Sequence, residues 1–227
     1  MKAPEGRFGQ YIALQKELAR QVRQCPLEGP IHRIGGADAA FSPDGKHCLA
    51  AVVVLAWPEL QRVEIAHARA PLDFPYIPGL LSFREAPAIL AAARALREPP
   101  DVLILDGQGL AHPRRCGLAC HVGVQLDWPT IGCAKSRLIG QHRHVGPKRA
   151  CQCTLRDGTD IIGKVVRTRT NVKPVYVSVG HRVNLSQAVR FVLDACTRYR
   201  LPEPLRLAHR RATEALKRQV GNLHQPE

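Results

Sequence analysis

The sequence predicts a mixed α/β sheet flanked by helices. Three strand-like segments joined by short turns follow one another between residues 31 and 69, which is typical of an antiparallel meander. From residue 82 onward, helix-like and strand-like segments alternate, which favours parallel strands. The chain has 227 residues and 45% of them are hydrophobic, so we expect residues 1–227 to form a single domain.

The chain is strongly basic, with 33 Lys and Arg against 19 Asp and Glu and a net charge of +14. This surplus favours a polyanionic partner, with nucleic acid ahead of an acidic membrane surface. Aromatic residues, at 5%, are too few for a protein that stacks many bases. No apolar run reaches the roughly 18 residues of a membrane span, and the polar N-terminal part lacks the apolar centre of a signal peptide. We expect a cytoplasmic monomer without a membrane partner.

The first half of the chain predicts one helix and three strands. Residues 11–25 carry apolar side chains at helical spacing. Residues 31–41 and 49–56 have the apolar composition of strands, residues 42–45 (SPDG) form a hairpin turn, and residues 59–69 alternate as a third strand. The apolar positions of the helix are Ile12, Leu14, Leu18, Ala19 and Val22.

The second half predicts alternating helices and strands. Ser82 with Glu85 three positions later matches a capping box, which indicates the start of a helix. Residues 102–105 (VLIL) follow two prolines and are wholly apolar, as in a buried strand. The remaining expected elements are a helix over 115–126, a strand over 129–135, a loop over 140–158, strands over 161–168 and 175–179, and helices over 185–199 and 205–220.

Two aspartates lie on neighbouring strands of this predicted sheet. Asp38 is surrounded by alanines within a strand, where an acid is costly to bury unless it is paired or bound to a metal. Asp106 ends the strand 102–105, and such strand ends are where open α/β sheets hold ligands. Asp38 could instead lie on a solvated strand face. Adjacent strands can bring the two acids to one edge, where carboxylates would suit a divalent cation.

The segment after this strand, residues 106–115 (DGQGLAHPRR), combines several functional groups. It offers the Asp106 carboxylate, the His112 imidazole and two guanidinium groups, including that of Arg114. Arginines suit phosphates. Taken alone, the segment favours an Asp-Gly turn with a solvated basic corner.

Three further residues each allow two interpretations. Tyr76 lies in a loop stiffened by prolines, residues 75–79 (PYIPG), and could enter a base stack as a wedge or cap the core. Glu85 could be only a capping partner or could face the ligand edge of the sheet. Lys135, at the end of a predicted strand, could contact a phosphate or point into solvent.

The eight cysteines are scattered through strand-like and helix-like segments, so we expect reduced thiols rather than a disulfide framework. One cluster has the pattern H-x-H followed by C-x-C and could hold zinc, although its spacing differs from the usual C-x₂-C. Its members are His142, His144, Cys151 and Cys153.

A mixed sheet with two acids at one edge resembles the RNase H-like nuclease fold, in which paired acids hold a divalent metal over a scissile phosphate. Five blocks, in the same order, resemble the endonuclease V (deoxyinosine 3′ endonuclease) family. These blocks are GADAAF, PYIPGLLSFRE, DGQGLAHPRR, IGCAKSRL and YRLPEPLRLAH. Together they extend from about Ile31 to His209, and the five in combination are very specific.

The resemblance implies roles for particular residues. Asp38, Glu85 and Asp106 match the acidic metal-binding residues of the family, and His209 matches a position, His or Asp in the family, that completes the site. The other implied site residues are His112 and Lys135 near the cleaved phosphate, Tyr76 as the wedge, and Pro75, Ile77, Pro78, Gly79 and Arg114 as DNA- or lesion-binding residues. Gln108 stands where the family often has His or Asn, which puts a metal-ligand or water role there in doubt, and Cys120 stands where Ser is common.

The resemblance also implies an activity: hydrolysis of the second phosphodiester bond 3′ to deoxyinosine in DNA, with Mg²⁺ as cofactor and Mn²⁺ as a substitute. Two alternatives stay open at this point. The chain could cleave RNA at inosine, because contacts to a 2′-hydroxyl leave no readable motif. It could also be a non-catalytic protein that binds inosine or an unusual nucleic-acid structure, although the presence of all three acids favours the enzyme.

Overall fold

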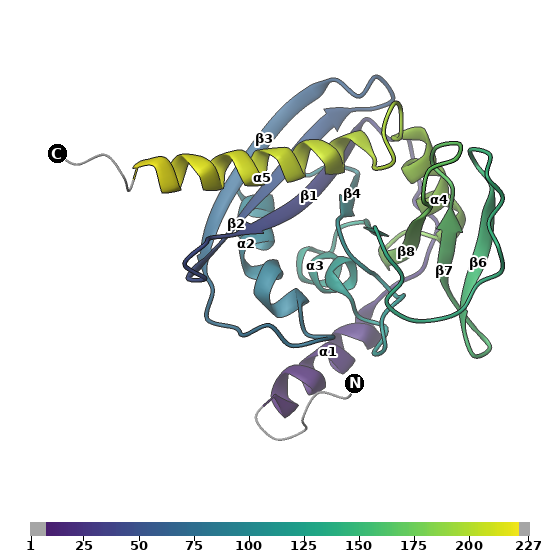
Figure 1. Ribbon diagram of the computed structural model, residues 1–227, viewed down its shortest axis with the longest axis horizontal. Coiled ribbons are helices and arrows are strands. Elements are labelled where there is room, and N and C mark those ends of the chain that lie inside the picture. Colours follow the sequence, from purple (N-terminus) through teal and green to yellow (C-terminus); the bar gives the residue numbers. More distant parts are fainter. Residues whose placement is uncertain (1–7, 223–227) are drawn as a thin grey trace.

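The computed structural model describes residues 8–222, so residues 1–7 and 223–227 of the predicted single domain lie outside the described part. Figure 1 shows the arrangement of its helices and strands. In chain order they are α1 (Gly9–Gln21), β1 (Arg33–Phe41), β2 (His47–Ala56), β3 (Arg62–Pro71), α2 (Ser82–Arg94), β4 (Val102–Leu105), α3 (Leu118–Leu126), β5 (Thr130–Ala134), β6 (Gln152–Asp157), β7 (Asp160–Val166), β8 (Val175–His181), α4 (Leu185–Asp194) and α5 (Glu203–Asn222).

The strands form one eight-stranded sheet in the order β3-β2-β1-β4-β5-β8-β7-β6. β1, β2 and β3 pair antiparallel, which confirms the predicted meander. β1, β4 and β5 run parallel at the centre of the sheet, and β8, β7 and β6 extend it antiparallel on the far side. The predicted combination of a meander with parallel strands is therefore confirmed.

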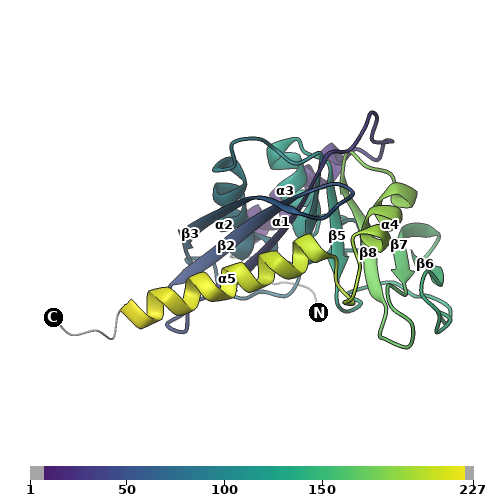
Figure 2. The ribbon, with the colours of Figure 1, turned by 90° about the horizontal axis from the view of Figure 1, so that it is seen from above.

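Helices cover both faces of the sheet, as Figure 2 shows from above. α4 and α5 lie on one face, where Phe191 and Leu205 pack against Ile34 and Ile104 of the central strands. α2 and α3 lie on the other face, over a second core. α1 packs outside α3 through Leu18. In the part of the chain that the structure describes, no helix is long and apolar enough to cross a membrane.

The structure corrects the predicted loop over residues 140–158, because Gln152–Asp157 form β6. β6 is the edge strand of the sheet, and Leu155 is its one fully buried side chain. With so little burial the strand has no alternating apolar pattern, and its backbone bonds to β7 hold it in place. Sequence periodicity therefore could not reveal it.

Two helices differ in detail from the expectation. The predicted apolar face of α1 includes Leu14, but Leu14 is 44% exposed whereas Gln15 is only 1% exposed. The predicted capping box of α2 is wrong, since the helix starts at Ser82 without a side-chain cap. The Ser82 hydroxyl contacts His121 instead, at 3.2 Å from Nδ1. Glu85 is therefore not a capping partner.

Several boundaries also shift. The helix predicted over 115–126 begins at Leu118, and the helix predicted over 185–199 ends at Asp194. α5 begins at Glu203, inside the break expected at 201–204, with Pro204 in its first turn. Proline is tolerated there because the first N–H groups of a helix have no partner within it.

Candidate active site

Three carboxylates meet at the carboxyl ends of the central parallel strands. Ala37 of β1 is in register with Leu105 of β4, so the residues that follow, Asp38 and Asp106, lie side by side. The Asp106 amide donates to the Ala37 carbonyl at 3.3 Å, which continues the ladder past the end of β4. Glu85 reaches the same place from α2, close enough for its charge to interact with both aspartates. The structure thus brings the three predicted acids together.

Two cationic or polar partners complete this cluster. Lys135 follows β5 directly, and its ammonium group pairs with the Asp106 carboxylate. His209 reaches over from α5, and its Nδ1 lies 2.6 Å from Oδ2 of Asp38. Side chains alternate between the faces of a strand, which places Asp38, Asp106 and Lys135 on the face that α5 covers.

A glycine lets α5 come close enough for this contact. A Cβ atom at Gly36 would lie 2.2 Å from the carbonyl carbon of Pro204, in the first turn of α5. Since no side chain stands between them, the start of α5 lies directly on the β1 backbone. His209 and Asp38 then face each other further along the same two elements.

The electrostatics of the cluster are those of crowded, partly buried acids. Burial and then the negative charge of Asp106 raise the pKa of Asp38. Burial, followed by the charges of Asp38 and Asp106, raises the pKa of Glu85 to about 8. Burial alone would lower the pKa of Lys135, but the hydrogen bond and the charge of Asp106 raise it. The positive charge of Lys135 therefore does not fully offset the negative charge of the acids in the cluster.

The donor set fits a hard divalent cation. Carboxylate oxygens are the ligands that such cations prefer, and a cation would relieve the mutual repulsion of Asp38, Glu85 and Asp106. Within residues 8–222, no three His, Cys, Asp or Glu side chains are arranged to hold an ion as they stand. Asp106 is engaged by Lys135 and Asp38 by His209. A cation would take over part of this charge pairing.

A pocket of about 370 Å³ opens beside the acids. Its wall includes Glu85, Asp106 and Lys135. It also includes residues 76–79 of the loop 75–79, which we call the wedge loop after the role predicted for Tyr76. The lining also includes polar and apolar residues from the turn after β4, the start of α3 and the segment after β5. These are Gly107, Gln108, His112, Gly117, Leu118, Ser136, Arg137 and Leu138.

The wedge loop presents Tyr76 to solvent. Tyr76 is 69% exposed, which contradicts the alternative that it caps the core. The neighbouring Ile77 and Leu80 are buried and anchor the loop, so the tyrosine stands on a fixed base. Ile77, Pro78 and Gly79 line the pocket, whereas Pro75 borders a different hollow beside Phe74 and α1.

The carbonyl of Gly79 ends this loop and accepts three donors. Nη2 of Arg114 lies 2.6 Å from it, and Nε2 of Gln15 and Nε2 of His112 each lie 3.1 Å away. Burial, and then the charge of Arg114, lowers the pKa of His112 to about 4, so its ring is neutral at pH 7. The Arg114 amide donates to Nδ1 at 3.2 Å, so Nε2 carries the proton. His112 thus lines the pocket, and the side chains of both His112 and Arg114 are hydrogen-bonded to the Gly79 carbonyl.

Sequence reasoning missed Gln15 and Arg200, which shape the site, and left the role of Gln108 in doubt. Gln15 is a buried polar residue on α1 that reaches the wedge loop, and its place on the helix among Leu18 and Val22 was the available signal. Gln108 donates to the Ser136 carbonyl at 2.9 Å and so holds the pocket wall, while its Oε1 is buried without a partner. Arg200 donates to the Lys135 carbonyl at 2.5 Å.

The four residues that could hold zinc do not form a group of ligands in the described chain. Nδ1 of His142 lies 3.7 Å from Sγ of Cys153, and no group of three or more potential ligands between residues 8 and 222 is arranged to hold a metal. The Cys153 thiol donates instead to the Arg143 carbonyl at 3.2 Å. All eight cysteines are free, as expected.

The profile of a known family matches this chain closely. The family described as Endonuclease V matches residues 16–210, which include the acids, the wedge loop and His209. The chain belongs to the Endonuclease V family. Endonuclease V of Roseiflexus castenholzii is 52% identical over 207 residues, which cover 91% of this chain and 92% of the relative.

Membership of the Endonuclease V family makes the chain a nuclease, a hydrolase of phosphodiester bonds. The family is one of metal-dependent nucleases. Endonuclease V from Streptomyces avermitilis superposes with a TM-score of 0.90 at 40% identity, covering 96% of this chain and 97% of that one. The predicted RNase H-like sheet is thereby confirmed.

A structure of Ciona intestinalis Endonuclease V shares the fold with a TM-score of 0.81 at 27% identity, covering 93% of this chain and 98% of that one. It was solved in complex with a 24mer DNA that contains an inosine followed by a ribo-adenosine.

Proposed function

We propose that this protein, acting as a single nuclease domain, recognises deoxyinosine in DNA and hydrolyses the second phosphodiester bond 3′ to the lesion. The observation that carries the proposal is the pocket of about 370 Å³ that connects the Tyr76 loop with Glu85, Asp106 and Lys135. A base that leaves the stack could enter this pocket while the backbone beside it passes the carboxylates. The Ciona relative bound to inosine-containing DNA supports the same assignment.

The carboxylates Asp38, Asp106 and Glu85 would hold the cofactor, for which we propose Mg²⁺, with Mn²⁺ as a substitute. When bound, this cation would supply neutralisation of the charge that develops on the phosphoryl, attacking and leaving oxygens. Without the cation the charges of Asp38 and Asp106 would repel the phosphate, and Lys135 offsets only part of them.

The chain's own residues orient the substrate. Lys135 stands with its ammonium group between Asp106 and the pocket, and we assign it to a phosphate oxygen next to the scissile bond. His209 holds Asp38 in place from α5. The neutral His112 acts as a positioning residue, since its Nε2–H is bound to the Gly79 carbonyl.

Recognition of the lesion falls to the wedge loop and the pocket. Tyr76 fills the gap left by the extruded nucleotide and so replaces part of the lost stacking. The proline neighbours keep its backbone fixed, which lowers the entropy lost on binding. Backbone groups of the pocket around Gln108 read the hypoxanthine edge without a charged side chain, since the Gly107 N–H is already bound to the Leu105 carbonyl at 2.9 Å.

The deciding experiment is cleavage of duplexes that carry one inosine, with matched adenosine duplexes as controls, in Mg²⁺ and in EDTA, with both product ends mapped. Nicking only with inosine and Mg²⁺, at the second bond on the 3′ side, would bear out the proposal. A parallel set of RNA oligonucleotides tests the endoribonuclease alternative. Binding to inosine without nicking in any metal would instead indicate the non-catalytic alternative.

An active-site variant separates this enzyme from a contaminating nuclease. Asp106→Asn keeps the size of the side chain but removes the charge that pairs with Lys135. We expect it to bind inosine DNA and to leave the strand intact. Glu59→Gln, an exposed acid outside the cluster, is the matched control and should cleave like the unaltered protein.

A further inference from the structure

We infer that Gln15 of α1 is a positioning residue for lesion recognition, because it fixes the carbonyl that ends the wedge loop. α1 would then be part of the recognition machinery rather than a helix packed on the outside of the domain. The inference rests on the proposed role of Tyr76 as a wedge and extends it to a residue that contacts neither the base nor the phosphate.

The amide of Gln15 joins three segments that are far apart in the sequence. Its Nε2 donates to the Gly79 carbonyl at 3.1 Å and to the Cys116 carbonyl at 2.7 Å. Its Oε1 accepts a hydrogen bond from Nε of Arg114. Gln15 thus uses both of its amide hydrogens and its oxygen, and it is only 1% exposed. A buried amide with all of these bonds made is held in one orientation.

These bonds converge on one point of the wedge loop. Arg114, oriented by Gln15, donates to the same Gly79 oxygen at 2.6 Å. Gly79 has a φ of +80°, a conformation that favours glycine, and a Cβ there would lie 2.8 Å from Nη2 of Arg114. The loop is therefore pinned at its C-terminal end by side chains, three residues after Tyr76.

These three hydrogen bonds matter because the other end of the loop, at Tyr76, is exposed. Tyr76 is 69% exposed and has few neighbours to keep its ring in place. A side chain that must separate stacked bases needs a rigid backbone beneath it, because a flexible loop would move before the stack opened. The three hydrogen bonds from Gln15, Arg114 and His112 to the Gly79 carbonyl supply this rigidity.

A double-mutant cycle tests the inference. Gln15→Met keeps the length of the side chain and removes all of its hydrogen bonds, and Tyr76→Ala removes the wedge. Affinity for inosine DNA is measured in EDTA for single strands and duplexes, in both single variants and the double variant. Gln21→Met is the matched control, because Gln21 lies on the same helix and bonds only to the exposed Glu17.

We expect Gln15→Met to weaken duplex binding by about fivefold, equivalent to about 1 kcal/mol at 1.4 kcal/mol per decade. Single-strand binding should change little, because no stack has to be opened. In the Tyr76→Ala background, Gln15→Met should cost nothing further, since two residues that act through one wedge are not additive. Gln21→Met should bind both substrates normally.

Three outcomes would overturn the inference. The loss could be equal on single strands and duplexes, it could be the same with and without Tyr76, or it could be absent. Each would show that α1 only packs against the domain. A loss of duplex binding in Tyr76→Ala would still support the proposed function. If Tyr76→Ala itself binds duplexes normally, the wedge fails and the inference with it. Should Gln15→Met melt below the assay temperature, Gln15→Glu serves instead, since it keeps the acceptor for Arg114 and sets an oxygen against the Gly79 carbonyl.

Discussion

Nδ1 of His209 lies 2.6 Å from Oδ2 of Asp38, although the two residues are 171 positions apart in the chain. The contact joins the last helix to the first strand and orients a carboxylate of the candidate metal site. His209 is itself exposed at its outer side, so it can meet a substrate or a cation as well as Asp38. The relationship brings α5 to the candidate active site, in addition to its place as a cover for the sheet.

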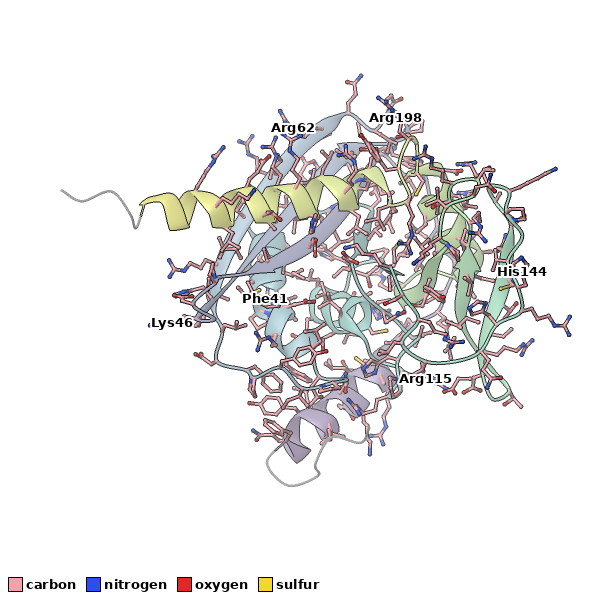
Figure 3. The ribbon with its side chains drawn as sticks, viewed as in Figure 1. Phe41, Lys46, Arg62, Arg115, His144 and Arg198 are labelled. Carbon is pink, nitrogen blue, oxygen red and sulfur yellow. The ribbon has the colours of Figure 1, made fainter. Side chains whose placement is uncertain are left out.

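The first prediction concerns this contact. His209→Ala should lower kcat by roughly 10²-fold, the lower end of the range for a residue that takes part in proton transfer or in holding a catalytic group. Binding of inosine DNA should stay within about twofold. His209→Gln, which can still donate to Asp38, should recover part of the rate. His144→Ala, a histidine in the loop before β6 labelled in Figure 3, is the control. Full activity in His209→Ala would remove α5 from the site.

The second prediction concerns pH and metal removal. Glu85 has its pKa raised from 4.5 to about 8, mainly by burial and then by Asp38 and Asp106. The folded protein therefore keeps a proton that the unfolded chain releases above about pH 4.5. In EDTA this contribution to stability is fully present below pH 4.5 and is lost as the pH rises through about 8.

The unfolding free energy in EDTA should accordingly fall by on the order of 2 kcal/mol between about pH 6 and pH 8 and level off above pH 8, and the melting temperature should follow it. Mg²⁺ should restore stability, and more strongly at the higher pH, because it binds the ionised carboxylate. Glu85→Gln should flatten the EDTA profile and abolish the Mg²⁺ effect. An EDTA profile of Glu85→Gln as steep as that of the unaltered protein would assign the pH dependence to other groups.

The third prediction concerns Arg200. Its Nη2 donates to the carbonyls of Lys135, at 2.5 Å, and Pro174, at 2.7 Å, and so fixes the segment that presents the Lys135 ammonium group. Arg200→Lys should hold both carbonyls less firmly, because a flexible ammonium group replaces the planar, rigid guanidinium. We expect kcat to fall by about tenfold, with KM nearly unchanged, and no further loss when Lys135 is already replaced by alanine.

Arg198→Lys is the control for this variant, since Arg198 lies two positions away and projects from the periphery of the molecule (Figure 3). Assays well below the melting temperature of both proteins separate misplacement of Lys135 from loss of fold. Equal falls in activity for Arg198→Lys and Arg200→Lys would argue against a specific role.

The fourth prediction concerns salt dependence. The net charge of +14 and the basic α5 favour steep salt dependence of non-specific DNA binding. Arg210 and Arg211 both pair with Glu214, at 2.6 and 2.9 Å, so part of their charge is already neutralised. Arg210→Ala with Arg211→Ala should flatten the slope of log affinity against log salt concentration by at most about two counterions. Glu214→Gln should steepen it, because it releases both guanidinium groups.

Glu17→Gln changes the net charge by the same amount on the opposite side of the fold, on α1. If α5 lies on the DNA path, Glu214→Gln should shift the slope and Glu17→Gln should not. Equal shifts would show that only the total charge matters, and an unchanged slope for both would move the path toward the Arg114 corner.

The parts of the fold that the sequence predicts are those with strong apolar periodicity. The meander, the strand 102–105 and the helices over the sheet are all buried on at least one face, so their patterns are clear. β6 was not predictable in this way, because an edge strand with one buried residue, Leu155, carries almost no periodic signal.

The residues of the candidate site likewise fall into those that the sequence predicts and those that it does not. The acids Asp38, Glu85 and Asp106 could be named from motifs, and the structure places them together. The supporting bonds of Gln15 and Arg200 could not, because they are made to backbone carbonyls, which every residue carries. A glutamine at a core position of α1 was the one local sign, and only the folded loop shows which carbonyl it meets.

The close approach of α5 to Gly36 has a consequence for the making of the protein. During synthesis the residues that carry the carboxylates emerge first, and α5, which adds Leu205 and Ala208 to the core, follows them. His209 arrives only with that helix, which must settle on a bare stretch of β1 backbone. A ribosome-bound or C-terminally clipped chain would therefore hold the acids without their final partner. In such a chain Asp38 would lack the contact that orients its carboxylate.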